Sequence, residues 1–130
     1  MKILLAEDDF ATRKYMVNML MKYGECDVAV DGIEAIDAFV MALEDGAPYD
    51  LICLDIMMPL MDGYQALASI RKLEEEQHIS ADKAVKVIIT TALKEQRNVK
   101  MAYELGCSVY SGKPIEPETF EAELKKMNLL

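Results

Sequence analysis

The stretch Leu51-Ile52-Cys53-Leu54-Asp55 places one carboxylate at the end of an apolar run, and Met57-Met58-Pro59 and Asp62-Gly63 follow it. A short apolar run bounded by proline, glycine and aspartate is typical of a buried strand that opens into a loop. Open α/β sheets place their functional groups at this end of their strands. Asp55 is therefore the first candidate for a chemical role.

Strand and helix signals alternate along the whole chain. Short apolar runs predict five strands, at Lys2 to Ala6, Asp27 to Val30, Leu51 to Leu54, Val85 to Thr90 and Ser108 to Ser111. Apolar residues at three- and four-residue steps predict five helices. The first contains Met16, Leu20 and Tyr23 and ends before Gly24, the second spans Ile33 to Leu43, the third Gly63 to Glu76 and the fourth Glu95 to Leu105, and the fifth begins at Pro117. Short connections of this kind predict a parallel sheet with helices on both faces.

The composition predicts one soluble domain over residues 1–130. A chain of 130 residues that is 52% hydrophobic can form a core without disulfides or a structural metal. The polar stretch Glu74 to Lys83 is predicted as a solvated loop. Cys26, Cys53 and Cys107 are scattered and form no CxxC motif, so we expect small core residues.

The charge and the length of the apolar runs exclude two classes of partner. The 14 basic and 23 acidic residues give a net charge of -9 without a continuous basic stripe, which argues against nucleic acid. No apolar run approaches the roughly 18 residues that a membrane span needs. The sequence therefore predicts a cytoplasmic protein.

Polar residues also follow three further predicted strands. The acids Glu7-Asp8-Asp9 follow the first strand, Thr91 follows the fourth, and Lys113 follows the fifth and precedes Pro114. Carboxyl ends of parallel strands share one edge, so these groups are expected to converge on Asp55. Clustered carboxylates repel one another, and Mg²⁺ relieves that repulsion with oxygen ligands. A carboxylate nucleophile with a lysine and a hydroxyl for the phosphoryl oxygens indicates phosphoryl transfer.

Each of these signals has a purely structural alternative. Any one of the three acids could cap the first helix. Lys113 could be an ordinary solvated lysine, and Thr91 could cap the turn before the fourth helix. The order acid cluster, acid, hydroxyl and lysine-proline at strand ends is hard to explain by solvation alone.

With these motifs, the chain resembles the receiver domains of two-component response regulators, over essentially its whole length. The motifs that carry the resemblance are Ile3-Leu4-Leu5-Ala6-Glu7-Asp8-Asp9, Leu54 to Gly63, Thr91-Ala92 and Gly112-Lys113-Pro114-Ile115. The resemblance implies a flavodoxin-like (βα)5 three-layer sandwich with sheet order 2-1-3-4-5. It also implies Asp55 as phosphoacceptor, the backbone carbonyl of Met57 as a metal ligand, Thr91 as switch hydroxyl and Lys113 as partner of the phosphoryl group.

Two choices within the motifs follow from the resemblance. The metal-site pair follows directly on the first strand, which indicates Glu7 and Asp8, with Asp9 as helix N-cap; a one-residue slip would make the pair Asp8 and Asp9. Tyr110 stands at the place of the switch aromatic. The readout surface would then be the fourth helix, fifth strand and fifth helix, with Lys94, Arg97, Tyr103 and Tyr110. The positions two residues beyond Asp55 and Thr91 tune the loss of the phosphoryl group in this family, and here they are Met57 and Leu93. Both side chains are apolar and would position an attacking water poorly, which predicts a long-lived aspartyl phosphate.

The implied function is a phosphorylation switch and not an enzyme, expected to be a stand-alone protein, with a receiver taken from a longer regulator as the alternative. A sensor histidine kinase or histidine phosphotransfer protein would dock on the apolar loop Met57 to Met61 and the first helix near Arg13, Lys14 and Val17, and a downstream protein would read the switch. His78, in a polar loop, is not expected to be phosphorylated. A monomer or weak dimer is expected.

Two alternatives are weaker. A haloacid-dehalogenase-type phosphohydrolase would carry a second Asp two residues after its nucleophile, where this chain has Met57. A pseudo-receiver would lack a site residue, and none is missing.

Overall fold

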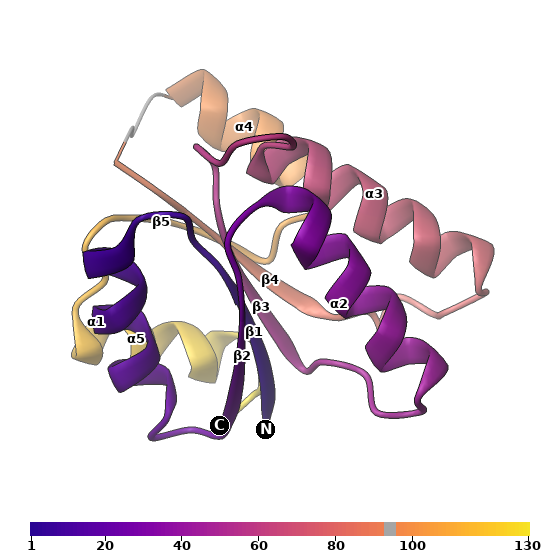
Figure 1. Cartoon of the computed structure of the whole chain (residues 1–130), viewed down its shortest axis with the longest axis horizontal. Helices are drawn as coiled ribbons and strands as arrows, with labels where there is room; N and C mark the ends of the chain where they lie inside the picture. The colour runs from indigo at the N-terminus through magenta and orange to yellow at the C-terminus, as the bar shows by residue number, and fades with distance from the viewer. Residues whose placement is uncertain (93–95) are drawn as a thin grey trace.

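The computed structural model describes residues 1–92 and 96–130 and shows strands and helices in strict alternation (Figure 1). The elements are β1 (Lys2–Ala6), α1 (Phe10–Leu20), β2 (Glu25–Ala29), α2 (Gly32–Glu44), β3 (Leu51–Asp55), α3 (Gly63–Glu76), β4 (Lys86–Thr91), α4 (Gln96–Glu104), β5 (Val109–Gly112) and α5 (Pro117–Lys126). The side chains of residues 96–98 and the predicted sites Leu93 and Lys94 lie outside the part described.

All pairings in the sheet are parallel, and the strand order is β2-β1-β3-β4-β5. Figure 1 shows α1 and α5 on one face and α2, α3 and α4 on the other. The predicted flavodoxin-like three-layer sandwich with order 2-1-3-4-5 is thereby confirmed.

The central strand β3 divides the core in two. All five of its residues are buried. Leu51 and Cys53 pack with α1 and α5, whereas Ile52 and Leu54 pack with α2, α3 and α4. The continuous apolar run that identified this strand follows from burial on both faces. Cys53 and Cys107 are buried, as predicted for small core residues, whereas Cys26 is half-buried, and all three are free thiols.

Several boundaries differ from the predicted ones by a few residues. β2 begins at Glu25 because the Glu25 amide donates to the Met1 carbonyl at 3.0 Å. Gly24 permits that approach, since a Cβ there would collide with the same carbonyl. α1 ends at Leu20, so Tyr23 lies beyond the helix. β3, β4 and β5 each extend one residue further than predicted, to Asp55, Thr91 and Gly112.

The predicted solvated loop from Glu74 to Lys83 is wrong at its start. α3 ends at Glu76, as predicted, and therefore includes Glu74, whose side chain is buried. Its Oε1 lies 2.7 Å from Arg71 Nη1, and its Oε2 accepts from the Val85 amide at 2.7 Å. A charged residue is buried here because an ion pair and a backbone donor replace its water.

Candidate functional site at the carboxyl edge of the sheet

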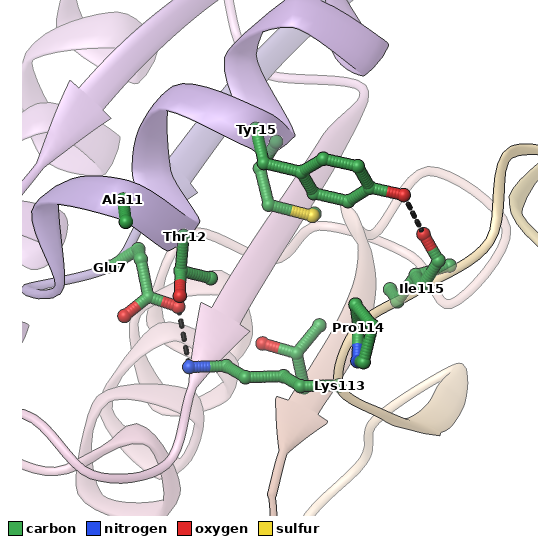
Figure 2. Close-up of a pocket in the computed structure, with 9 residues that line it drawn as sticks. Glu7, Ala11, Thr12, Tyr15, Lys113, Pro114 and Ile115 are labelled. Atoms are coloured by element: carbon green, nitrogen blue, oxygen red, sulfur yellow. Dashed lines mark hydrogen bonds and ion pairs between the residues drawn. The ribbon is translucent and has the colours of Figure 1, made fainter.

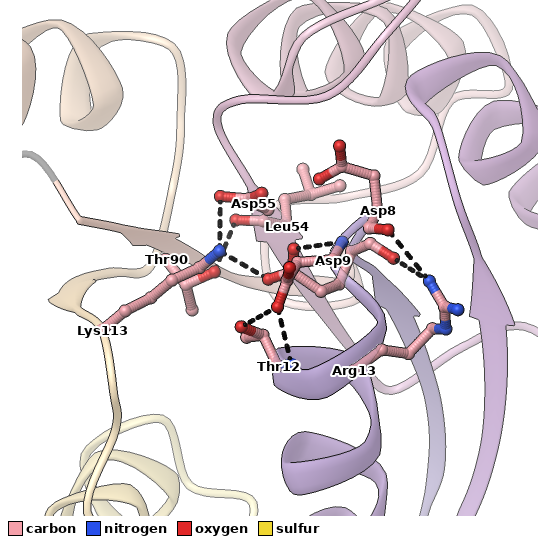
Figure 3. A network of polar contacts seen from close by, with 9 residues as sticks. Asp8, Asp9, Thr12, Arg13, Leu54, Asp55, Thr90 and Lys113 are labelled. Atoms are coloured by element: carbon pink, nitrogen blue, oxygen red, sulfur yellow. Dashed lines mark hydrogen bonds and ion pairs between the residues drawn. The ribbon is translucent and has the colours of Figure 1, made fainter.

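The ends of β1, β3 and β5 bring four charged side chains together, and we call Glu7, Asp8, Asp55 and Lys113 the carboxylate site (Figure 3). One oxygen from each of the three acids lies within 4.8 Å of the others. Glu7 and Asp55 are buried, whereas Asp8 is exposed. The predicted convergence of these residues is therefore observed.

Lys113 joins two of the three carboxylates. Its Nζ lies 2.6 Å from Glu7 Oε1, drawn in Figure 2, and 3.0 Å from Asp55 Oδ1. The Lys113 amide also donates to the Thr91 carbonyl at 2.8 Å, which fixes the end of β5 beside β4. The lysine is a half-buried ion-pair partner and not the solvated residue of the structural alternative.

Asp9 serves the helix and not the carboxylate site. Its side chain accepts from the Thr12 amide at 2.9 Å and from Thr12 Oγ1 at 2.7 Å, which makes Asp9 the N-cap of α1. These hydrogen bonds lower the pKa of Asp9. The acids that face Asp55 are thus Glu7 and Asp8, the register expected first.

The loop after β1 is held in place by Arg13, which sequence reasoning assigned only to a docking surface. Arg13 Nη1 donates to the carbonyls of Glu7 at 3.0 Å and Asp8 at 3.2 Å. Gly63 has a comparable role behind Asp55, because a Cβ there would collide with the Asp55 carbonyl oxygen. Backbone contacts therefore hold both acidic segments against the sheet edge.

Burial and charge act on the site in opposite directions. Desolvation raises the pKa of Glu7, although its hydrogen bond with Lys113 opposes that effect. Burial alone would lower the pKa of Lys113, but its hydrogen bonds to Glu7 and Asp55 outweigh burial and raise it. Lys113 is therefore a firmly held cation among three acids.

The donor set suits a hard divalent cation. Three carboxylates face one ammonium group, so the carboxylate site has more negative than positive charge. Mg²⁺ binds through one or two carboxylates and keeps several waters, and exposed Asp8 leaves room for such waters. The residues present fit Mg²⁺.

Two neighbouring threonines end β4, and they face opposite layers. Thr91, the predicted switch hydroxyl, is buried. Thr90 pairs in register with Asp55, and its hydroxyl donates to the Leu54 carbonyl at 3.3 Å. Sequence reasoning passed over Thr90, although the doubled threonine was the signal that two hydroxyls reach this edge.

Of the predicted readout residues, Tyr103 lies in α4 and Tyr110 lies in β5. Tyr110 is half-buried and packs against the core beneath α2, α3 and α4. Its amide donates to the hydroxyl of exposed Tyr103 at 3.3 Å. The Arg97 side chain lies outside the described residues. His78 is exposed in the turn after α3.

The predicted docking loop is partly core. Met57 and Leu60 are strongly exposed, whereas Met58 is buried and Met61 is half-buried. On α1, Phe10, Arg13, Lys14 and Val17 line a shallow surface pocket. In the described parts of the chain, every helix is too short or too polar to cross a bilayer.

Comparison with known proteins agrees with this geometry. The family model for the response regulator receiver domain matches residues 3–125. The chemotaxis protein CheY of Treponema pallidum is 33% identical over 117 residues, covering 88% of this chain and 74% of that protein. The probable transcriptional regulator ycf29 of Porphyra purpurea is 31% identical over 126 residues. The match covers 96% of this chain but only 55% of the regulator's length.

A solved structure extends the likeness to the fold. The BeF3-activated DrrB receiver domain superimposes with a TM-score of 0.75 at 25% identity, covering 99% of this chain and 97% of that one. Sequence, site and fold therefore agree, and the chain belongs to the response regulator receiver domain family of two-component signalling.

Proposed function

We propose that this domain accepts a phosphoryl group on Asp55 in a Mg²⁺-dependent reaction and changes its α4–β5–α5 surface in response. The observation that carries the proposal is the position of Asp55. Its buried carboxylate lies 3.0 Å from the Lys113 ammonium and within 4.8 Å of oxygens of Glu7 and Asp8. A nucleophile, a cation for the phosphoryl oxygens and a metal-binding acid pair thus meet at one point.

Glu7, Asp8, Asp55 and the backbone carbonyl of Met57 would hold the metal. Bound Mg²⁺ would neutralise carboxylate charge and polarise the oxygens of the incoming phosphoryl group. The unequal charge of the carboxylate site supports this assignment, because three acids share only one lysine.

The chain's own residues would perform the transfer. A carboxylate oxygen of Asp55 attacks phosphorus, and the bond between phosphorus and the donor's leaving group breaks. The Lys113 ammonium, which now contacts Asp55, would move to an oxygen of the transferred group and balance its charge. Positioning and charge neutralisation account for the catalysis, as in other phosphoryl transfers.

The switch would use Thr91 and Tyr110. A phosphoryl oxygen on Asp55 would accept a hydrogen bond from the Thr91 hydroxyl, and the shift of β4 would favour the inward packing of Tyr110. Phosphorylation would act by shifting a population between two packings. The response is limited by how much the phosphoryl group favours one packing over the other.

The proposed phosphodonor is a sensor histidine kinase or histidine phosphotransfer protein, and the proposed target is another protein. Exposed Met57 and Leu60 beside Asp55 and the α1 surface near Arg13 would receive the donor. A monomer or weak dimer fits this role. The phosphohydrolase alternative is disfavoured because the residue two beyond Asp55 is exposed Met57, which supplies no acid.

Intact mass after incubation with Mg²⁺ and acetyl phosphate tests the proposal. Wild type is expected to gain one phosphoryl group, and Asp55→Asn is expected to gain none. Asp50→Asn, an exposed acid just before β3, is the matched control and should react like wild type. An adduct of equal yield on Asp55→Asn would refute Asp55 as the acceptor.

The apolar Met57 side chain supports a slow loss of the phosphoryl group. Its exposed thioether accepts hydrogen bonds only weakly and would position an attacking water poorly. After removal of the phosphodonor, Met57→Glu is expected to lose the adduct about tenfold faster than wild type, in keeping with general acid–base effects. Equal decay rates would contradict this role.

A further inference from the structure

A cavity of about 330 Å³ lies between α1 and the segment that follows β5 (Figure 2). Its walls include Ala11, Thr12, Tyr15 and Met16 of α1, with Pro114 and Ile115 opposite. Glu7 and Lys113, two members of the carboxylate site, form one end of the cavity. The cavity borders that site without coinciding with it, because its lining contains neither Asp8 nor Asp55.

The size and lining suit a small, flat, mainly apolar molecule. Ligand pockets in proteins start at about 300 Å³ and are mostly apolar with a few polar groups. An engineered apolar cavity of about 150 Å³ binds benzene, so a cavity of about 330 Å³ has room for a fused two-ring molecule. Tyr15 and Met16 supply an aromatic face and a thioether for contact.

The polar groups of the cavity are mostly acceptors. The Tyr15 hydroxyl donates its proton to the Ile115 carbonyl at 2.7 Å. The Thr12 hydroxyl donates to Asp9, and the Thr90 hydroxyl donates to the Leu54 carbonyl. Each hydroxyl oxygen can still accept, since it has two lone pairs. The cavity therefore favours a ligand that donates N–H or O–H.

Charge disfavours an anionic ligand. The Lys113 ammonium that faces the cavity is already paired with Glu7 and Asp55. The neighbouring acids outnumber it, and the whole chain carries a net charge of -9. A neutral ligand avoids both the repulsion from Glu7 and the desolvation of a further charge.

We propose that this cavity is a binding site for a neutral heteroaromatic molecule with an N–H or O–H donor, of the size of indole. The ligand packs against Tyr15, Met16 and the aliphatic stem of Lys113. One consequence rests on the proposed function: a ligand against Lys113 restricts the movement of its ammonium toward a phosphoryl group, so the phosphorylation of Asp55 slows.

Binding is tested on the ¹⁵N-labelled full chain without Mg²⁺ or phosphodonor, by titration with indole and detection of amide shifts. Shifts are expected at Thr12, Tyr15, Thr90 and Ile115. 1-Methylindole, which lacks the N–H, is expected to bind about tenfold more weakly, the scale of one lost hydrogen bond. Anionic indole-3-carboxylate keeps its N–H and is expected to bind more weakly than indole because its charge meets Glu7.

Two leucine variants of α1 locate the site. Ala11 lines the cavity and is exposed, so Ala11→Leu fills the entrance and is expected to weaken indole binding at least about tenfold, a ratio that corresponds to about 1.4 kcal/mol. Asn18→Leu lies on the same helix outside the cavity lining and should bind like wild type. No indole shifts in wild type, equal affinity in Ala11→Leu, or equal affinity for 1-methylindole would overturn the proposal.

The effect on phosphorylation is measured separately, as the rate of adduct formation from acetyl phosphate. Indole at its wild-type dissociation constant is expected to slow wild type and to slow Ala11→Leu far less, because the variant binds indole at least about tenfold more weakly. An equal rate with and without indole in wild type would overturn the coupling to Lys113. A wild type that binds indole but never forms an adduct would refute the proposed function and leave the binding site intact.

Discussion

Two clusters of charged side chains lie at opposite ends of the strands, one at their carboxyl ends and one at their amino ends, and the two are built differently. At the carboxyl edge, the carboxylate site sets three acids against Lys113. At the amino edge, Arg71 and Glu74 form one pair, which we call the Arg71 clamp together with its backbone partners Val85 and Gly106. Arg71 donates to the carbonyls of Gly106 at 2.8 Å and Val85 at 2.8 Å.

This difference indicates that the Arg71 clamp has a structural role, whereas the carboxylate site is suited to bind a cation. In the Arg71 clamp, charges balance, and both Glu74 oxygens have a partner. The carboxylate site carries an unbalanced negative charge at a sheet edge where exposed Asp8 admits solvent. Charged side chains whose charges cancel and whose polar atoms all have partners connect helices and strands. A cluster with excess negative charge is suited to bind a cation.

The largest expected effect comes from opening the Arg71 clamp. Glu74→Ala leaves the Val85 amide and the Arg71 guanidinium without their carboxylate, so we expect a loss of about 3 kcal/mol in the free energy of unfolding, the lower end for a broken buried pair. Urea denaturation measures it. Glu75→Ala, at the exposed neighbouring position, should change stability by less than about 0.5 kcal/mol. Equal effects of the two variants would show that the clamp does not hold the fold.

Mg²⁺ is expected to stabilise the folded state by binding at the carboxylate site and not at the Arg71 clamp. At about one hundred times its dissociation constant, Mg²⁺ is expected to stabilise wild type by about 2.7 kcal/mol through selective binding to the folded state. Asp8→Asn should remove this increment, because Asp8 contributes to the charge excess. Glu74→Ala should keep it despite lower stability. An increment that survives in Asp8→Asn would contradict the contrast between the two edges.

Helix α3 connects the two edges, and its first turn can be weakened separately. Asp62 caps α3 by accepting from the Gln65 amide at 2.8 Å, and the Asp62 amide in turn donates to Gln65 Oε1 at 3.1 Å. Asp62→Ala is expected to cost about 1 kcal/mol in urea denaturation. Gln65→Ala should cost less, because the cap on the Gln65 amide remains. The reverse order would contradict the importance of this cap.

The smallest effect concerns Asp9 and pH. Thr12 lowers the folded-state pKa of Asp9, so its contribution to stability is present above the unfolded-state pKa and is lost as pH falls through the folded-state pKa. Asp9→Asn keeps a capping oxygen without a charge. The stability difference between wild type and Asp9→Asn should therefore shrink in acid. A difference independent of pH would place the role of Asp9 elsewhere.

The parts of the fold that could be predicted from the sequence are those that depend on a single physical effect, such as burial of apolar side chains or the geometry of parallel strands. β3 was found because both of its faces are buried, and its Leu51 to Leu54 run is therefore continuously apolar. The sheet edge was found because parallel strands bring their carboxyl ends together. The start of β2 was missed because Glu25 is exposed and is held by a backbone bond to Met1.

The burial of Glu74 and the position of Thr90 beside Asp55 could not be predicted from sequence patterns, because both depend on contacts between separate elements. Glu74 looked like one of several solvated acids, and its burial depends on Val85, which is distant in sequence. A signal existed, since Leu67, Ile70 and Glu74 share one helical stripe, and Leu67 and Ile70 are fully buried. Thr90 could not be separated from Thr91 without the register that pairs Thr90 with Asp55. The roles of Thr91, Lys113 and Tyr110 remain proposals.

The most direct test of the central claim is to locate the phosphoryl group by borohydride reduction followed by peptide sequencing. Reduction converts an aspartyl phosphate to homoserine, so the modified residue is identified by its position. Homoserine at position 55, formed only when Mg²⁺ and acetyl phosphate are both present, is the predicted result. Homoserine at Asp8 or Asp9, or its formation at Asp55 without Mg²⁺, would contradict the account.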